Sequence, residues 1–187
     1  MRADRYVKPL ALVACVALVG FIAFAVVSAS SHPARSFPAV PPASRLAHGE
    51  AAPAFRASRL GGGAEVSFTG RSPLPTVVNF FASWCTDCVA ELDAFGAVSR
   101  HTPGTRFIGV DSDDPNQKAA EQLLRRAGIS YSVGVDGSGA IANRYLVAAL
   151  PVTFFISASG SVESALFGAA SASELRAGIA RLHGGHG

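Results

Sequence analysis

Two cysteines three positions apart, Cys85 and Cys88, are the residues of this sequence best suited to chemistry. A C-x-x-C pair at the start of a helix supplies one thiol that attacks a disulfide and a second that resolves the mixed disulfide. Unpaired N–H groups and the helix dipole would favour a thiolate on Cys85, and Cys88 would lie one turn further in and be less exposed. We therefore expect Cys85 to attack and Cys88 to resolve, with their disulfide as the redox centre and no other cofactor.

The same spacing could form half of a zinc site, which requires a second pair of Cys or His ligands. The histidines of the expected folded part are His101, His183 and His186, and the last two lie in a Gly-rich tail. The third cysteine, Cys15, lies in an apolar run. We expect no metal site, and the single available pair also excludes a scaffold held together by several disulfides.

The composition limits the size of the fold and the kinds of partner that we expect. The chain has 187 residues, of which 49% are hydrophobic, so it can bury the core of one domain. Its net charge of +3 arises in the N-terminal region, because from residue 50 onward 11 basic residues stand against 12 acidic ones. A nucleic-acid-binding domain would carry a basic excess in its folded part. We expect no nucleic-acid partner.

The N-terminal region predicts a membrane anchor. Residues 1–9 carry a basic excess, and residues 10–27 are 18 positions without a charge, near the lower limit of a spanning helix, roughly 17–25 residues. The basic excess before this run predicts a cytoplasmic N-terminus and an extracytoplasmic domain on a single-pass cell-membrane protein. A cleaved signal sequence is the alternative, because residues 27–29 (Val-Ser-Ala) would serve as a cleavage site. A lipoprotein signal ending at Cys15 is disfavoured, because the apolar stretch before it is very short.

The rest of the chain divides into a tether and one α/β domain. Residues 28–49 contain four prolines and few large apolar residues, which predicts a semi-extended linker. Residues 50–187 alternate strand and helix patterns. The expected elements are a hairpin over 55–60 and 64–68, strands over 76–81, 106–110, 131–135, 152–156 and 162–167, and helices over 87–100, 115–128, 140–146 and 171–183. We expect Asp114 to be the N-cap of the second of these helices, and Ser171 to form a capping box with Glu174 at the last.

The chain resembles the TlpA/ResA-like branch of the thioredoxin superfamily over roughly residues 50–183. The resemblance is carried by the segment 77–85 (VVNFFASWC) and by Leu150-Pro151-Val152-Thr153. It implies a thioredoxin-like α/β fold, in which a mixed central sheet is flanked by helices, with an N-terminal β-hairpin, an inserted helix–strand and a preceding transmembrane helix. It further implies a cis Leu150–Pro151 bond opposite the dithiol, with the backbone of Leu150 pairing to an extended substrate. A structural turn proline is the alternative.

The resemblance implies roles for two more polar residues. Glu91 lies three residues after Cys88 and so beside it on one helical face. In the resembling family a glutamate at this spacing is buried and manages the proton of the resolving cysteine, which requires a raised pKa. A solvated helix glutamate is the alternative. Asn79 stands where thioredoxins carry a buried aspartate, and we expect it to be a hydrogen-bonded polar group of the core.

Three residues around the cysteines are expected to shape the site. Together with Leu150 and Pro151, Trp84 is expected to bind substrate, and it either covers the dithiol as an apolar lid or simply packs. Thr86 and Asp87 replace a dipeptide in which the family usually has a proline, so the reduction potential is open. Our hypothesis is that the charge of Asp87 partly offsets the stabilisation of the Cys85 thiolate and makes the pair more reducing, and its alternative role is that of a favourable acidic residue in a first helical turn.

These residues predict an extracytoplasmic thiol–disulfide oxidoreductase. The resemblance favours a reductase of protein disulfides in cytochrome c maturation, with apocytochrome c as the substrate class and an unidentified membrane electron donor. A disulfide oxidase for secreted proteins is the first alternative, since the same site runs in either direction. A peroxiredoxin is disfavoured because the matching positions of the P-x-x-x-T/S-x-x-C pattern hold Val78 and Ala82. A redox-inert binding module is disfavoured by the presence of both cysteines.

Overall fold

The structure, a computed structural model, describes residue 46 and residues 48–184. The predicted membrane segment, residues 10–27, the N-terminal residues 1–9 and nearly all of the predicted linker lie outside the described residues, as do Cys15 and His186. Within the part that is described, no helix has both the length and the apolar character needed to cross a membrane.

A five-stranded mixed sheet forms the centre of the domain, in the order β5-β4-β3-β6-β7. The strands are β3 (Thr76–Phe81), β4 (Arg106–Ser112), β5 (Ser132–Asp136), β6 (Val152–Ile156) and β7 (Val162–Phe167). β3 runs parallel to β4, and β4 to β5, whereas β6 is antiparallel to both β3 and β7. Every residue of β3 is buried, as its run of apolar and β-branched residues requires of a central strand covered on both faces. The prediction of a mixed sheet is confirmed.

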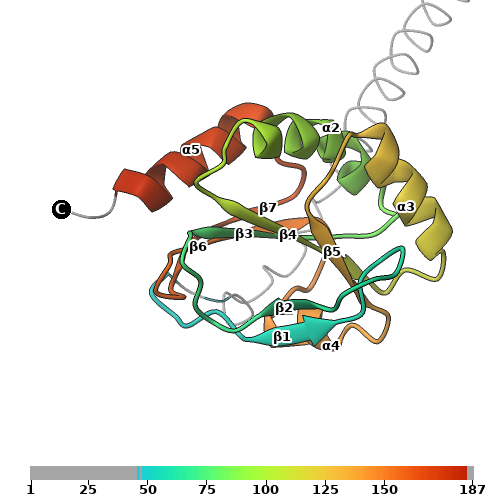
Figure 1. Cartoon of the computed structure of the whole chain (residues 1–187), viewed down its shortest axis with the longest axis horizontal. Helices are drawn as coiled ribbons and strands as arrows, with labels where there is room; N and C mark the ends of the chain where they lie inside the picture. Colours follow the sequence, from blue (N-terminus) through green and yellow to red (C-terminus); the bar gives the residue numbers. More distant parts are fainter. Residues whose placement is uncertain (1–45, 47, 185–187) are drawn as a thin grey trace, which may run out of the picture. The chain divides into compact units, whose positions relative to one another are not determined.

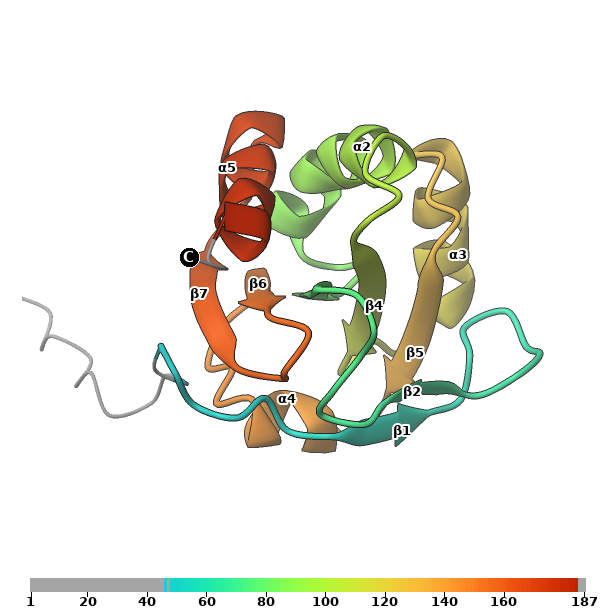
Figure 2. The same cartoon turned by 60° about the vertical axis from the view of Figure 1, so that its left-hand side comes forward.

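Three helices cover one face of this sheet: α2 (Thr86–Arg100), α3 (Gln117–Arg126) and α5 (Ala172–Gly184). Figures 1 and 2 show them side by side above the strands, with α2 between the other two. α5 begins at the predicted capping box, because the backbone N–H of Ser171 donates to the Glu174 carboxylate and the N–H of Glu174 donates to the Ser171 hydroxyl.

The opposite face is covered by the predicted N-terminal hairpin, β1 (Phe55–Ala57) with β2 (Val66–Phe68), and by the short helix α4 (Ala140–Arg144). Both hairpin strands are shorter than predicted. Tyr145, which follows α4, is fully buried, and its ring packs edge-on or tilted against aromatic rings of the hairpin and the sheet. This second layer lets both faces of the sheet be apolar.

The segment from residue 49 to residue 60 is hydrogen-bonded to the sheet at both of its ends. Residues 49–52 exchange backbone hydrogen bonds with residues 160–162, at the turn between β6 and β7. Residues 58–60, which follow β1, bond to Val133 and Val135 of the edge strand β5. The segment therefore covers part of one sheet edge and anchors at the turn beside the other.

The predicted start of α3 is wrong, and α4 ends two residues earlier than predicted. The N-cap of α3 is Asn116, whose side-chain oxygen accepts from the N–H of Ala119, and α3 begins two residues later than predicted. Asp114 does not cap the helix because its carboxylate is held by the N–H groups of Ser83 and Asn116. The predicted end near Gly128 is confirmed, since α3 has Ala127 as its C-cap and Gly128 follows in the left-handed conformation.

Gly96 provides a test of how α2 packs against α3. A β-carbon at this position would overlap the backbone carbonyl of Ala127, which ends α3. Alanine in a helix interior otherwise gains about 1 kcal/mol over glycine. We expect the overlap to dominate, so that Gly96→Ala lowers the free energy of unfolding by about 1–3 kcal/mol in urea titrations. Gly137→Ala, where a β-carbon meets nothing within 4 Å, is the control and should change it by less than about 0.5 kcal/mol; a Gly96→Ala protein as stable as the wild type would contradict this packing.

Candidate active site

Cys85 and Cys88 form a disulfide at the start of α2, with a Cα–Cα separation of 5.2 Å. Cys85 is the N-cap of the helix, and its Sγ accepts a hydrogen bond from the N–H of Cys88 at 3.2 Å. Cys85 retains 7% of its surface, whereas Cys88 retains none. An incoming sulfur can therefore reach Cys85 more readily, and the same N–H group would stabilise a thiolate on Cys85.

The disulfide is positioned by the central strand. β3 ends at Phe81, and residues 82–84 carry the chain directly into α2. The Cys85 N–H donates to the carbonyl of Ala82 at 3.2 Å, which closes this turn. Phe81, Cys85 and Cys88 belong to one buried cluster that also includes side chains of α3. The redox pair thus lies at the carboxyl end of the best-buried strand of the sheet.

Glu91, one helical turn after Cys88, is almost completely buried, with 2% of its surface exposed. One carboxylate oxygen accepts from the Asn79 amide and the other from the backbone N–H of Ala170, each at 2.8 Å. Burial raises the pKa of Glu91 to about 7, although both hydrogen bonds act against the rise, and the charge of Asp87 adds to it. The solvated alternative is wrong, and Glu91 can take up or release a proton near neutral pH.

Asn79 links Glu91 to the neighbouring strand. Its amide nitrogen donates to Glu91 and also to the hydroxyl of Thr153, its register partner on β6, at 3.3 Å. The side-chain oxygen of Asn79 has no hydrogen-bond partner among the described residues. Asn79 therefore behaves as the polar core group expected from the sequence, and it orients Glu91.

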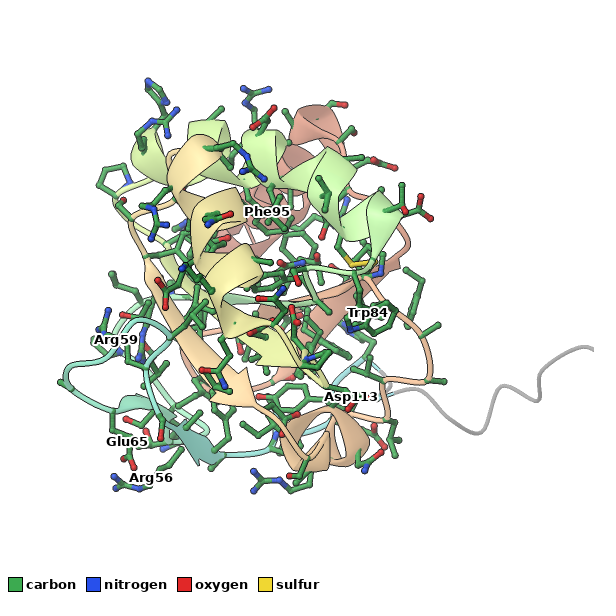
Figure 3. All side chains as sticks on the ribbon, turned by 90° about the vertical axis from the view of Figure 1, so that its right-hand side faces the viewer. Arg56, Arg59, Glu65, Trp84, Phe95 and Asp113 are labelled. Atoms are coloured by element: carbon green, nitrogen blue, oxygen red, sulfur yellow. A yellow bond between two sulfur atoms is a disulfide. The ribbon has the colours of Figure 1, made fainter. Side chains whose placement is uncertain are left out.

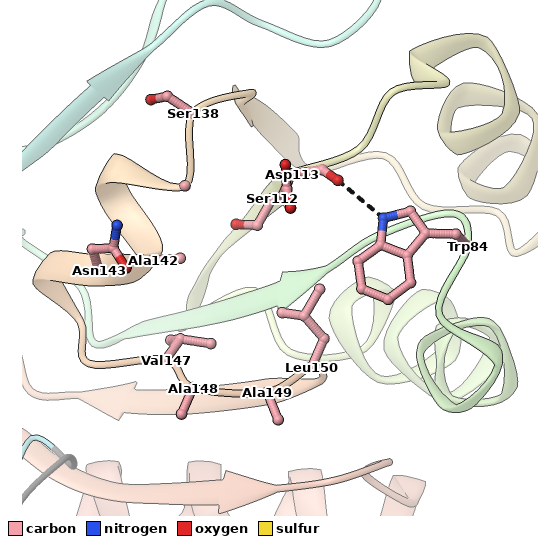
Figure 4. Close-up of a pocket in the computed structure, with 11 residues that line it drawn as sticks. Trp84, Ser112, Asp113, Ser138, Ala142, Asn143, Val147, Ala148, Ala149 and Leu150 are labelled. Carbon is pink, nitrogen blue, oxygen red and sulfur yellow. Dashed lines mark hydrogen bonds between the residues drawn. The ribbon is translucent and has the colours of Figure 1, made fainter.

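The Leu150–Pro151 peptide bond is cis. Leu150 packs against the cluster that contains both cysteines, so the structure places the segment before β6 beside the disulfide. Leu150 and Trp84 also line one surface pocket of about 330 Å³, shown in Figure 4. Two of the three residues predicted to bind substrate, Trp84 and Leu150, therefore line one recess, to which Trp84 belongs as the residue before Cys85.

Trp84 is an exposed residue, with 58% of its surface accessible. Its indole Nε1–H donates to the backbone carbonyl of Asp113 at 3.0 Å, and Figure 3 shows Trp84 and Asp113 close to each other. This exposure contradicts the simple packing alternative. Thr86 and Asp87 are also exposed in the first turn of α2, where they can meet solvent or substrate.

Sequence reasoning missed a buried carboxyl group, Asp111, behind this site. β4 extends two residues beyond the predicted strand, which pairs Asp111 with Phe81 at the end of β3. Asp111 is completely buried, and burial, together with the nearby carboxylate of Asp114, raises its pKa to about 8. The available signal was an acidic residue at the carboxyl end of a strand parallel to the one that leads into C-x-x-C, since such ends commonly form sites.

No group of three or more His, Cys, Asp or Glu side chains in the part of the chain that the structure describes could hold a metal ion. The arrangement is instead that of a thiol–disulfide site. A central strand leads into a helix capped by one cysteine of a C-x-x-C pair, with a cis proline beside it on a mixed sheet. These features define a thioredoxin-like protein.

The chain belongs to the AhpC/TSA family, whose family model matches residues 48–165. Among curated proteins, it is 27% identical over 128 residues to the thiol-disulfide oxidoreductase ResA of Oceanobacillus iheyensis, covering 65% of each chain. It is 29% identical over 166 residues to the thiol:disulfide interchange protein HelX of Rhodobacter capsulatus, covering 86% of this chain and 88% of HelX. The chain spans about half to two thirds of the length of the first curated relatives it matches.

A solved structure supports the same placement. A secreted disulfide oxidoreductase of Mycobacterium tuberculosis, described as homologous to Escherichia coli DsbE, superposes with a TM-score of 0.61 at 26% identity. The match covers 68% of this chain and 96% of that one. The predicted thioredoxin-like fold and the resemblance to ResA-like proteins are confirmed by these comparisons.

Proposed function

We propose that this protein is a thiol–disulfide oxidoreductase that exchanges disulfides with other proteins. The observation that carries the proposal is the Cys85–Cys88 pair itself, with the more accessible sulfur at the helix cap and the buried one a turn from Glu91. The names of the relatives agree with it. The disulfide is the redox centre, so the exchange needs no further cofactor.

The proposed reaction begins with the reduced dithiol. The Cys85 thiolate attacks one sulfur of a substrate disulfide, forms a mixed disulfide and releases the other substrate sulfur as a thiolate. Glu91 then accepts the proton of the Cys88 thiol, and the Cys88 thiolate attacks the Sγ of Cys85. The second substrate sulfur leaves, the Cys85–Cys88 disulfide closes, and two electrons have passed to the substrate.

The surroundings of the disulfide suit an extended protein substrate. We propose that the backbone of Leu150, next to Pro151, pairs with the substrate chain, while Trp84 contacts a substrate side chain in the recess that it lines. Thr86 and Asp87, exposed between the two cysteines, are the residues proposed to tune the reduction potential.

The proposed direction is reduction of extracytoplasmic protein disulfides. Support comes from the resemblance to proteins of cytochrome c maturation, in which the substrate is apocytochrome c with its haem-binding cysteines. The apolar run at residues 10–27 would anchor the domain outside the cell membrane, close to a membrane electron donor. A peroxidase role lacks the proline and hydroxyl residue that its pattern requires, because Val78 and Ala82 stand there.

The reduction potential of the Cys85–Cys88 pair tests the direction. The protein is equilibrated with dithiothreitol or glutathione buffers, and the fraction of free thiol is measured by alkylation and mass spectrometry. We expect a reduction potential of about −270 mV or below, which is the range of reducing thioredoxins. A value near about −120 mV, that of a strong oxidant, would replace the reductase by a disulfide oxidase, and a pair that does not titrate at all would contradict exchange in either direction.

A further inference from the structure

The loop between β4 and α3 holds the active-site turn at two points. The carboxylate of Asp114 accepts a hydrogen bond from the backbone N–H of Ser83 at 2.5 Å. The backbone carbonyl of Asp113 accepts from the indole of Trp84, as the dashed line in Figure 4 shows. Ser83 and Trp84 are the two residues before Cys85, so this loop fixes the approach of the chain to the attacking sulfur.

Asp111, at the beginning of the same loop, is a buried acid with no evident role in the exchange reaction. Its side chain has no exposed surface, and among the described residues the one hydrogen-bonding contact of its carboxyl group is with the carboxyl group of Asp114. A carboxylate isolated from water in this way is strongly disfavoured unless it is neutralised by a proton. The pKa of about 8 agrees with a protonated Asp111 at neutral pH.

Asp114 has the opposite tendency. Burial alone would raise the pKa of Asp114, but the hydrogen bonds from the N–H groups of Ser83 and Asn116 outweigh it and bring the pKa below its ordinary value. Asp114 is therefore the ionised member of the pair. The two carboxyl groups influence each other's pKa in opposite directions, as expected when two close acids share one proton.

Asp114 is the charged group that interacts with Asp111, and the other neighbours of Asp111 in the sheet supply no charge to it. The register partners of Asp111 are Phe81 on β3 and Val135 on β5, neither of which titrates. The next acid on β5, Asp136, bonds to Ser112 and to the N-terminus of α4, on the other face of the sheet. The disulfide sulfurs do not titrate in the oxidised protein.

We propose that Asp111 and Asp114 hold one proton between them and thereby fix the turn from Ser83 to Cys85, which makes Asp111 a positioning residue of the dithiol site. Its importance for exchange rests on the proposed function, whereas the proton sharing itself does not. When the shared proton is lost, two negative charges face each other in a buried site, and their repulsion weakens the hold of Asp114 on Ser83. The surroundings of Trp84 then change.

Trp84 is the only tryptophan of the chain, so it reports on this turn without signal assignment. The full-length oxidised protein is labelled with ¹⁵N-tryptophan, and its single indole signal is followed from pH 6 to pH 10. We expect one titration step near pH 8 in the wild type. Asp111→Asn, whose neutral amide can donate to Asp114 as the protonated acid does, should lose this step and keep the low-pH signal position throughout.

Two further variants test which carboxyl group causes the titration step of the Trp84 signal. Asp93→Asn removes an exposed carboxylate of α2 and should leave the step in place. Glu91→Gln should also leave it in place, because Glu91 titrates nearer pH 7. A step that persists in Asp111→Asn, or that disappears in Glu91→Gln instead, would overturn the proposal.

A second measurement on the wild type covers the case in which Asp111→Asn does not fold. With ¹³C-labelled aspartate, one side-chain carboxyl signal should titrate between pH 7 and pH 9. If every aspartate carboxyl titrates below pH 6, Asp111 shares no proton and the proposal is wrong. Both experiments use the oxidised protein without a redox partner, so they can succeed or fail independently of the exchange activity.

Discussion

Replacing Cys88 with serine should leave a protein that forms a lasting mixed disulfide through Cys85, whereas replacing Cys85 should abolish disulfide exchange. The reason is the unequal exposure of the two cysteines, because Cys85, the cap of α2, retains 7% of its surface and Cys88 retains none. Loss of a nucleophile commonly reduces turnover by at least about 10³-fold. The measurement is the rate of insulin reduction, together with mass spectrometry of disulfide-linked products under non-reducing conditions.

Cys15→Ser is the matched control, since it removes a cysteine that lies outside the described domain. This variant should reduce insulin at the wild-type rate and form no lasting adduct. If Cys85→Ser, rather than Cys88→Ser, accumulates the mixed disulfide, the assigned order of attack is reversed. If neither single variant loses activity, the pair is not the exchange centre.

The second large effect is expected at Glu91. Its pKa is raised to about 7, so the fraction able to accept a proton from Cys88 increases as the pH rises through that value. The resolution of a mixed disulfide should therefore become faster from about pH 6 to pH 8. Glu91→Gln removes the base while keeping a similar shape, and we expect resolution to slow by about 10²-fold or more and to lose this pH dependence.

Resolution is measured directly by preparing the mixed disulfide of Cys85 with a small thiol and following its release by stopped flow. Asp93→Asn, a change of the same charge on the exposed side of α2, should retain both the wild-type rate and its rise with pH. A Glu91→Gln protein that keeps the rise would show that another group takes the proton. The rate of the first step, attack by Cys85, should change far less than the rate of resolution.

The features that depend on local sequence were predictable. The buried character of β3 follows from its unbroken run of apolar and β-branched residues, and the start of α5 follows from Ser171 and Glu174, which bond to each other. The position of the cysteines at a helix start follows from the C-x-x-C spacing and the strand before it. In each case the interacting residues are near neighbours in the chain, so the pattern contains its own partners.

The features that depend on residues far apart in the sequence were not predictable from local patterns. The sequence around Asp114 is typical of a helix N-cap, but the Asp114 carboxylate accepts a hydrogen bond from Ser83, 31 residues earlier. The burial of Glu91 was implied only by the family resemblance, because its hydrogen-bond partners include Ala170, which lies 79 residues later. Asp111 could be recognised only once β4 and β3 were paired in register. A sequence pattern cannot distinguish these groups from solvated acids, because the pKa of each is determined by what the fold brings around it.

The backbone bonds between residues 49–52 and residues 160–162 hold the N-terminal segment at the turn between β6 and β7. That turn follows Ile156, which pairs with Thr76 at the beginning of β3. Cys85 follows the other end of β3. These bonds and the redox pair therefore lie at opposite ends of the central strand, so a protein that forms a mixed disulfide with Cys85 does not compete with the bonds that hold the N-terminal segment in place.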